Sequence, residues 1–366
     1  MKTIAIATFL YTNYGALLQG YALQKYLKSN TNFNIININF RTNEHDLDAR
    51  IFNLYGSLRS RVSQVLFTLL RLKGLTQRKL RTEKFKKDYF NMTTVYRTVE
   101  EFVKNPPPAD VYVTGSDQVF NPFGKYKEVF FLNFSKNNAR KVAYAASFGV
   151  SEYTDEVTLD ISQYIKDFDA LSCREIEGAD YLNQITEKQV YWVLDPSFLL
   201  TDVEWAVVSV APKIKEKYIF VYALAEERKL IDIARKIKSV TGYKIVCVRY
   251  NTRDFINIDK FVYGCGPSEL LGFIRSAEAV VTDSFHGTVF SVIFDKKFYS
   301  YISRPKYAVR IYNLISLLDA WDRVIDSENY SAFNPSIELK EMRKDKLAKK
   351  IEDSKKFIYE EIACED

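Results

Sequence analysis

The stretch AVVTDSFHGTVF, residues 279–290, joins two apolar runs through a short polar turn. The first run has the length and composition of a buried strand, and apolar residues resume from Thr288 to Phe294 as in a helix. We therefore predict a strand, a turn over residues 283–287 and a helix. In open parallel α/β sheets, ligands bind at the carboxyl ends of the strands, where the following helix offers unpaired N–H groups to an anion. This turn is the first candidate for a ligand site.

The turn brings together a hydroxyl, an imidazole and a glycine, from Ser284, His286 and Gly287. The chain has only two histidines, so a reaction that needs an imidazole near neutral pH has few candidates. A histidine in such a turn can equally be a polar residue with satisfied hydrogen bonds or a helix cap, and the local pattern alone leaves both interpretations open.

Length and composition predict a globular protein of two domains. The chain has 366 residues, which is longer than single cores usually grow. Hydrophobic residues make up 47% and charged residues 27%, as in ordinary globular proteins. The four cysteines are far apart and form no C-x-x-C pair, which argues against a zinc or iron–sulfur site and against a disulfide framework. Such cysteine usage suits a reducing cytoplasm.

The apolar N-terminal segment is better explained as a first strand and helix than as a signal peptide, because it lacks a convincing cleavage site. No run of apolar residues reaches the eighteen or so that would span a bilayer. We therefore expect a cytoplasmic protein, with contact at the inner membrane face as one alternative.

That alternative rests on the distribution of charge. The net charge is +6, and residues 59–88 contain ten basic residues against two acidic ones. Residues 58–89 have a helical pattern with apolar residues on one face. A basic amphipathic helix can lie on anionic lipid, or it can be a solvated helix packed on its own domain. No nucleic-acid recognition motif is present, so nucleic acid is not an expected partner.

Strand-then-helix units recur in both halves of the chain. In the first half, strands are predicted at 2–8, 33–40, 110–114 and 141–146, and after a crossover near 190–200 the pattern restarts with strands at 218–223, 244–249 and 279–282. Repeated βαβ units indicate two doubly wound α/β domains facing across a cleft. We place the domains at residues 1–193 and 194–335, with a C-terminal helix over residues 336–366 that packs outside and ties the halves together.

Polar residues follow several predicted strands and are expected at one cleft. After the first strand come Asn13, Tyr14 and Gly15, and after the 110–114 strand come Ser116, Asp117, Gln118 and Asn121. Asp117 has the chemistry of a general base or an acceptor for a sugar hydroxyl, and it could also cap a turn. Arg174 lies near a helix start, where the helix dipole does not stabilise it, so an anionic ligand or a neighbouring acid would be its partner. No G-x-G-x-x-G motif signals a dinucleotide site.

Five motifs occur together in order. They are NYGALLQGYAL at 13–23, GSDQVFNP at 115–122, SCRE at 172–175, LDPSFLL at 194–200 and TDSFHGTVFS at 282–291. With these motifs the sequence from Met1 to about Leu318 resembles the polysaccharide pyruvyl transferase family. The resemblance implies a GT-B-like architecture of two Rossmann-like domains. It also implies transfer of the pyruvyl group of phosphoenolpyruvate to sugar hydroxyls as a ketal.

The resemblance also implies roles for residues. His286 corresponds to the histidine of the family's phosphoenolpyruvate site. Other branches have Arg-Leu-His where this chain has Ser284-Phe285-His286, so another cation must replace that arginine. Arg174 matches a family arginine, and Arg304, Lys306 and Arg310 are further candidates. Asp117 or Asp283 would deprotonate the sugar hydroxyls, and the chemistry demands no metal or other cofactor.

The expected function is therefore pyruvyl transfer in the biosynthesis of a surface polysaccharide such as a capsule or exopolysaccharide. The C-terminal domain would hold phosphoenolpyruvate, and the N-terminal domain would hold a saccharide acceptor, either free or lipid-linked. The basic segment 59–88 would dock at the anionic inner leaflet. Two alternatives stay open: a GT-B glycosyltransferase that uses a nucleotide sugar, and a catalytically silent protein of polysaccharide assembly.

Overall fold

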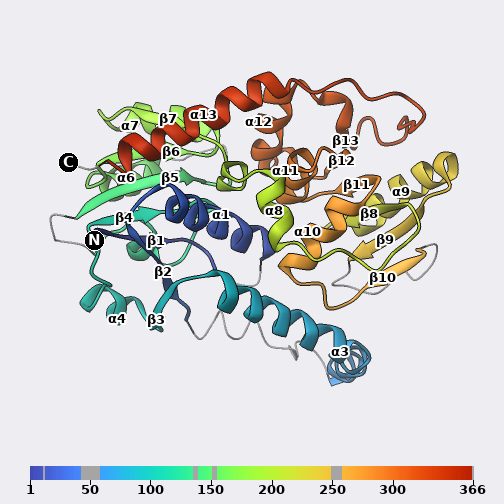
Figure 1. Cartoon of the computed structure of the whole chain (residues 1–366), viewed down its shortest axis with the longest axis horizontal. Coiled ribbons are helices and arrows are strands. Elements are labelled where there is room, and N and C mark those ends of the chain that lie inside the picture. The colour runs from blue at the N-terminus through green and yellow to red at the C-terminus, as the bar shows by residue number, and fades with distance from the viewer. Residues whose placement is uncertain (11–12, 43–57, 135–138, 151–154, 249–257, 365–366) are drawn as a thin grey trace.

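The computed structural model describes the chain except for residues 11–12, 43–57, 135–138, 151–154, 249–257 and 365–366 (Figure 1). Of residues 58–71 and 155–157 it describes the backbone alone. His45 lies outside the described residues.

The first domain is built on a parallel sheet of seven strands in the order β3-β2-β1-β4-β5-β6-β7. The strand β1 (Thr3–Ala7) lies at its centre, paired with β2 on one side and β4 on the other. Ile4 and Ile6 face one core, while Ala5 and Ala7 face another, so both faces of the sheet are buried as parallel sheets require. The other strands are β2 (Asn34–Phe40), β3 (Met92–Tyr96), β4 (Val111–Thr114), β5 (Arg140–Ala146), β6 (Ala170–Cys173) and β7 (Val190–Trp192).

The second domain repeats this plan in a parallel sheet of six strands, ordered β10-β9-β8-β11-β12-β13. Its strands are β8 (Tyr218–Tyr222), β9 (Lys244–Val248), β10 (Lys260–Val262), β11 (Ala279–Thr282), β12 (Lys297–Ile302) and β13 (Val324–Asp326). In each sheet the strand order reverses beside the first strand, between β1 and β4 and between β8 and β11. These reversals are the topological switch points where doubly wound folds bind ligands.

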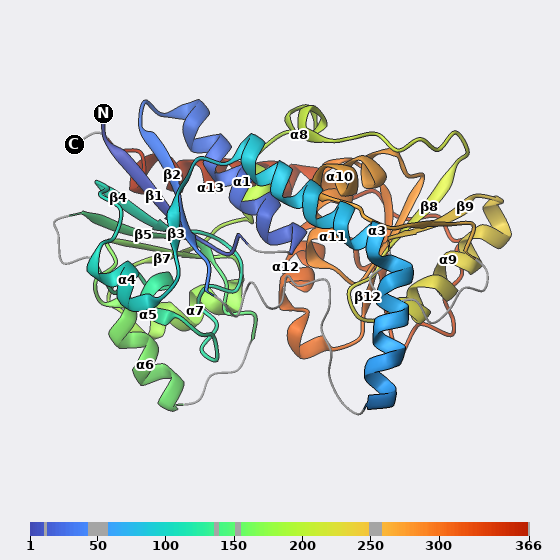
Figure 2. The same cartoon turned by 90° about the horizontal axis from the view of Figure 1, so that it is seen from below.

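Helices cover both sheets (Figures 1 and 2). Those of the first domain are α1 (Tyr14–Asn30), α3 (Leu58–Tyr89), α4 (Val99–Lys104), α5 (Lys127–Phe130), α6 (Asp155–Ile165) and α7 (Ile176–Ile185). Those that follow are α8 (Asp202–Val208), α9 (Glu227–Thr241), α10 (Pro267–Ser276), α11 (Phe285–Ile293), α12 (Val309–Leu318) and α13 (Lys344–Glu361). Short 3-10 turns occur at Pro196–Leu199, Pro305–Tyr307 and Trp321–Arg323. Two Rossmann-like domains packed in this way are the fold that the sequence predicts.

The two domains share an apolar core. Leu18 and Tyr21 of α1 and Phe85 of α3 are buried in one cluster with Phe220 of β8 and Phe290 of α11. Because residues from both domains are packed in this cluster, the geometry of the cleft between them is fixed by buried side chains.

Helix α13 contacts both domains along its length (Figure 1). Near its start, Leu347 joins the core of the second domain. Further along, Ser354 accepts a hydrogen bond from the N–H of Leu194, and Phe357 is buried in the core of the first sheet. The C-terminal helix thus ties the two halves together.

Helix α3 also reaches the second domain (Figure 2). Arg78 donates to the hydroxyl of Tyr14 at 3.0 Å, and Arg81 donates to the carbonyl of Gly264 at 2.7 Å and pairs with Glu269 at 3.1 Å. These two basic residues therefore serve contacts within the protein. Membrane contact through the rest of segment 59–88 stays a prediction. Among the described residues, no helix is long and apolar enough to cross a bilayer.

Candidate functional site at the facing switch points

A cavity of about 520 Å³ opens where the switch points of the two sheets face each other. The first domain lines it with residues that follow β1 and β4, including Asn13, Asp117 and Gln118. The second domain lines it with residues that follow β8, β11 and β12. The position agrees with the rule that doubly wound folds bind ligands at the carboxyl ends of strands on either side of a switch point.

The turn after β11 forms the wall contributed by the second domain. Ser284 is the N-cap of α11, and its hydroxyl accepts the N–H of Gly287 at 3.2 Å. A Cβ atom at Gly287 would lie 2.4 Å from Oγ1 of Thr282, so only glycine allows α11 to start this close to its own strand. The predicted strand, turn and helix are all present, and they bring His286 to the cavity.

His286 is held between Gly15 in the first domain and Asp195 in the crossover between the domains. Gly15 lies so near that a Cβ atom there would come within 2.1 Å of Nδ1. On the other side, Nε2 lies 3.5 Å from Oδ2 of Asp195. The imidazole is 8% exposed, and Nε2 has no hydrogen-bond partner among the described residues. The ring is therefore fixed in place between Gly15 and Asp195.

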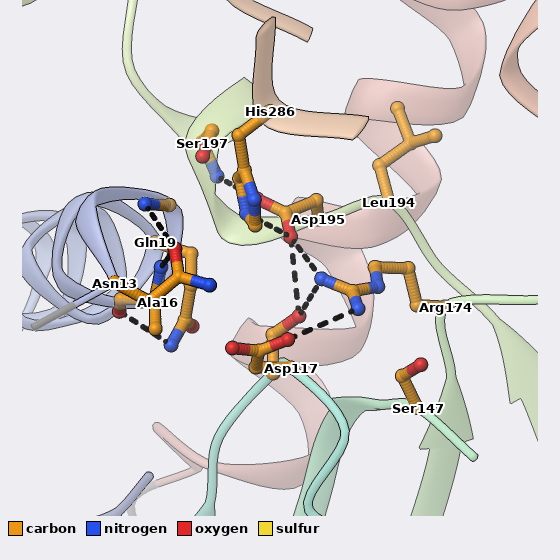
Figure 3. A network of polar contacts seen from close by, with 12 residues as sticks. Asn13, Ala16, Gln19, Asp117, Ser147, Arg174, Leu194, Asp195, Ser197 and His286 are labelled. Carbon is orange, nitrogen blue, oxygen red and sulfur yellow. Dashed lines mark hydrogen bonds and ion pairs between the residues drawn. The ribbon is translucent and has the colours of Figure 1, made fainter. Parts of the chain in front are cut away.

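Arg174 links Asp195 to Asp117 beneath the cavity (Figure 3). Its Nη1 lies 2.7 Å from Oδ2 of Asp195, and its Nη2 lies 3.6 Å from Oδ1 of Asp117. Ser116 completes the cluster, since its hydroxyl accepts from Arg174 at 3.2 Å and donates to Asp195 at 3.2 Å. An anionic ligand and a neighbouring acid were the alternatives for Arg174, and the structure provides neighbouring acids.

Burial and charge act in opposite directions on the two carboxyl groups next to Arg174. Burial would raise the pKa of Asp195, but His286 and then Arg174 outweigh it and hold that pKa well below its usual range. For Glu175 burial prevails and raises the pKa, although Arg174 and Arg310 oppose the shift. The hydroxyl of Ser147 donates to Oε1 of Glu175. Asp195 is therefore the ionised partner of the buried arginine and of His286.

A second arginine, Arg310, reaches the cavity from α12. Its guanidinium carbon lies 5.6 Å from the ring centre of Phe285, and that of Arg174 lies 4.8 Å from the same ring. Burial and the neighbouring Arg174 both lower the pKa of Arg310. No ion pair joins Arg310 to any residue that the structure describes, whereas Arg174 has three carboxylate neighbours. Arg310 is thus the cavity arginine whose charge an anionic ligand could neutralise.

Other predicted residues also line the cavity. Asn13 caps α1 by accepting the N–H of Gly15 at 2.9 Å, and Gln118 packs its amide against Gly149. Arg304 is exposed at the rim. Asp117 has a positive φ of 79°, a conformation that is strained for most residues and tolerated best by Gly, Asn and Asp.

Six of the predicted site residues are not among those that line the cavity: Tyr14, Gly15, Ser116, Asn121, Arg174 and Gly287. Tyr14 is 1% exposed, and its hydroxyl donates to the carbonyl of Cys265 within the interface of the two domains. Asn121 accepts the N–H of Phe123 at 2.9 Å and so caps its own turn.

Asp283 has a structural role that the sequence did not predict. Its carboxylate accepts the backbone N–H groups of Leu224 at 2.7 Å, Ala225 at 2.8 Å and Glu226 at 2.8 Å. These groups lead into α9, which has no side-chain cap of its own. Asp117 is therefore the better placed of the two candidate bases.

Sequence reasoning missed the roles of Asp195 and Glu175. Both residues stand in motifs that the sequence singles out, LDPSFLL and SCRE. The sequence did indicate that Arg174 needs a partner, because the helix dipole does not stabilise a cation near a helix start. Spacing along the chain does not indicate which acids fold next to that arginine.

Fold and site together define a class: a GT-B-like protein of two Rossmann-like domains with a cavity at their interface that is lined by charged residues of both signs. The sequence of residues 13–304 matches the family described as polysaccharide pyruvyl transferase. The match covers most of the chain, and the protein belongs to this family.

Two solved structures share the fold. Arabidopsis thaliana UGT89C1 complexed with UDP-L-rhamnose is 9% identical, with a TM-score of 0.51, and the match covers 98% of this chain and 95% of that one. The UDP complex of S. aureus MnaA is 10% identical, with a TM-score of 0.51 and coverage of 91% and 87%. No curated protein matches this chain.

Proposed function

We propose that this protein is a pyruvyl transferase that moves the pyruvyl group of phosphoenolpyruvate to two hydroxyls of a sugar, forming a ketal. The observation that carries the proposal is that His286 and Arg310 line one cavity, in a chain that belongs to the polysaccharide pyruvyl transferase family.

The donor is a small, multiply charged anion. Guanidinium groups bind carboxylate and phosphate oxygens with paired, charge-assisted hydrogen bonds. Arg310 supplies such a group beside Phe285, and Arg304 lies at the rim of the cavity. These arginines take the place of the family arginine at position 284, where this chain has the helix-capping Ser284.

His286 is the proposed acid. Its imidazolium transfers a proton to the methylene carbon of phosphoenolpyruvate, and positive charge develops on the carbon that carries the phosphate oxygen. Asp195 stabilises the imidazolium and fixes the ring, since its ionised carboxylate lies 3.5 Å from Nε2. Gly15 closes the other side of the ring.

Asp117 is the proposed base. The first sugar hydroxyl adds to the cationic carbon and gives its proton to Asp117, which lines the cavity with a side chain that is 13% exposed. The second hydroxyl then adds to the same carbon as the bond to the phosphate oxygen breaks. Inorganic phosphate leaves with the remaining proton, and the product is a pyruvate ketal. Cavities of roughly 300–1,000 Å³ accommodate ligands larger than the donor alone, so about 520 Å³ leaves room for a sugar ring.

The acceptor would be a saccharide of a surface polysaccharide, free or carried on a lipid. The donor side of the cavity would be the second domain, which supplies His286 and Arg310, and the acceptor side would be the first, which supplies Asn13, Asp117 and Gln118.

The test is a thermal-unfolding titration of the wild type and His286→Ala with phosphoenolpyruvate, uridine diphosphate and inorganic phosphate. A ligand at 100 times its Kd stabilises the native state by about 2.7 kcal/mol, and no acceptor is needed. We expect a rise in Tm that is selective for phosphoenolpyruvate and smaller in His286→Ala. Stabilisation by uridine diphosphate alone would replace this proposal with a nucleotide-sugar glycosyltransferase. Stabilisation by none of the three would favour the catalytically silent assembly protein.

A further inference from the structure

Next to the cavity, the N-terminus of α7 in the first domain meets α12 of the second domain. The backbone N–H of Ile176 donates to Oδ1 of Asn313 at 2.9 Å. The amide of Asn313 donates in turn to both oxygens of Glu177, at 3.3 Å and 3.1 Å. Asn313 is 8% exposed, whereas Ile176 and Glu177 are exposed, so the contact is buried only on its α12 side.

Asn313 performs a task that usually belongs to the residue at the start of a helix. The first N–H groups of any helix lack partners within it, and an N-cap side chain normally supplies one. The N-cap of α7 is Glu175, whose side chain makes no capping bond and instead contacts Arg174 and Ser147. The missing cap is provided by Asn313 from the other domain.

Helix α12, which carries Asn313, also carries Arg310 one turn earlier. Residues three apart lie on one face of a helix, so the face that touches α7 also presents Arg310. Arg310 packs on Phe285, which also contacts Arg174, and Glu175 is electrostatically coupled to both arginines. The contact of Asn313 with α7 therefore sets the position of Arg310 relative to Arg174.

The position of Arg310 is under electrostatic load. The two guanidinium groups next to Phe285 repel each other, and nearby carboxylates such as Glu175 offset only part of this repulsion, since Arg174 still helps to lower the pKa of Arg310. The shared core fixes the overall arrangement of the domains, and the contact of Asn313 with α7 adds a local restraint on α12. Affinity for an anion depends on such preorganisation.

We propose that Asn313 is a positioning residue: with Ile176 and Glu177 it forms a latch between the two domains that holds Arg310 beside Arg174, ready for an anion. The latch rests on the proposed function only in naming phosphoenolpyruvate as that anion. Asn313 itself touches neither donor nor acceptor.

The experiment exchanges the two polar groups of the latch. Asn313→Asp still accepts the N–H of Ile176 but places a carboxylate against Glu177. In the double variant Asn313→Asp with Glu177→Gln, the amide at position 177 can donate a hydrogen bond to the carboxylate at position 313. Affinities for phosphoenolpyruvate and for inorganic phosphate are measured by calorimetry, and the radius of gyration without ligand is measured by small-angle X-ray scattering. Glu177→Gln alone is the matched control, since one of its oxygens can still accept from Asn313.

We expect Asn313→Asp to weaken anion binding about tenfold and to enlarge the radius of gyration, because two carboxylates then face each other where an amide faced a carboxylate. The double variant should recover to within about threefold of the wild type, as expected for coupled neighbours. KM for phosphoenolpyruvate should rise in Asn313→Asp while kcat changes far less.

Unchanged affinity in Asn313→Asp, or a loss that the double variant does not restore, would overturn the latch. If the wild type binds phosphate but not phosphoenolpyruvate, the proposed function fails while the phosphate affinities still decide on the latch. If the wild type binds neither anion, the scattering data decide: a radius that grows in Asn313→Asp and shrinks again in the double variant supports the latch, and a constant radius refutes it.

Discussion

The imidazole of His286 in the second domain lies directly against Gly15 in the first turn of α1. A Cβ atom at position 15 would approach Nδ1 to 2.1 Å and Cγ to 2.5 Å. Because Cγ is the root of the ring, the whole imidazole would have to move to make room. The absence of a side chain at Gly15 is therefore what permits His286 to lie next to Asp195.

We expect Gly15→Ala to displace His286 and to reduce pyruvyl transfer as strongly as His286→Ala does. Overpacking of a buried site costs about 1–3 kcal/mol. The helical preference of alanine over glycine returns only about 0.5–1 kcal/mol. A net loss of stability should appear as a lower Tm in thermal unfolding, and phosphate release from phosphoenolpyruvate should fall with it.

The control for this prediction is Gly15→Ala in the His286→Ala background. The ring that would collide is then gone, so the alanine should no longer cost stability, and the double variant should be at least as stable as His286→Ala. Equal penalties in both backgrounds would mean that Gly15 acts through some contact other than His286.

Much of the fold could be predicted because the sequence pattern is local. The run 279–282 followed by Ser284 and a second apolar run defines a strand, a cap and a helix within about a dozen residues. The repeat of such units in both halves indicates two doubly wound sheets. The family resemblance then linked His286 to one particular cavity.

The site could be predicted only in part, because its contacts join distant segments. Asp195 and Arg174 meet through tertiary packing, and the polar character of Tyr14 gave no sign that its hydroxyl would be buried against Cys265. Asp283 was a candidate base because it follows β11, yet its carboxylate is used by backbone N–H groups that come from another strand's loop. Patterns along one chain segment cannot specify partners of this kind.

The two arginines that line the cavity, Arg310 and Arg304, should differ in their contribution to donor binding. Arg310→Gln removes a largely enclosed cation, and a charge-assisted hydrogen bond of this type contributes about 1.5–3 kcal/mol. KM for phosphoenolpyruvate should therefore rise between about 10- and 100-fold. Arg304→Gln changes an exposed residue that solvent screens, so its effect should be within about threefold. Steady-state kinetics of both variants check the order, and a larger effect at Arg304 would move the anion to the rim.

Asp117 and Asp283 form a matched pair for separating catalysis from structure. Asp117→Asn keeps a residue type that tolerates the positive φ, so Tm should change little, while loss of the base should lower kcat about 100-fold or more. Asp283→Asn leaves N–H groups without their carboxylate partner and should cost about 1–3 kcal/mol of stability. Unfolding curves and single-turnover rates distinguish the two. A large loss of kcat in Asp283→Asn together with a loss of stability in Asp117→Asn would make Asp283 the base.

The last prediction concerns the pH dependence of stability at Asp195. The pKa of its carboxyl is held well below the ordinary value of 3.8, chiefly because His286 and Arg174 outweigh the effect of burial. A carboxyl with a depressed pKa stabilises the folded state above its ordinary pKa, and the contribution is lost as pH falls toward the folded value. Asp195→Asn leaves Arg174 without its closest carboxylate, and breaking a buried pair costs about 3–5 kcal/mol.

Wild type and Asp195→Asn should therefore differ in unfolding free energy near pH 5, and the difference should shrink below about pH 4. Urea unfolding at a series of pH values measures it. Asp345→Asn is the control, because Asp345 also has a lowered pKa, of about 2, through Arg343 but is fully exposed, and solvent should leave that substitution with little effect. A difference at Asp195 that persists unchanged to pH 3 would show that its charge is not what stabilises the site.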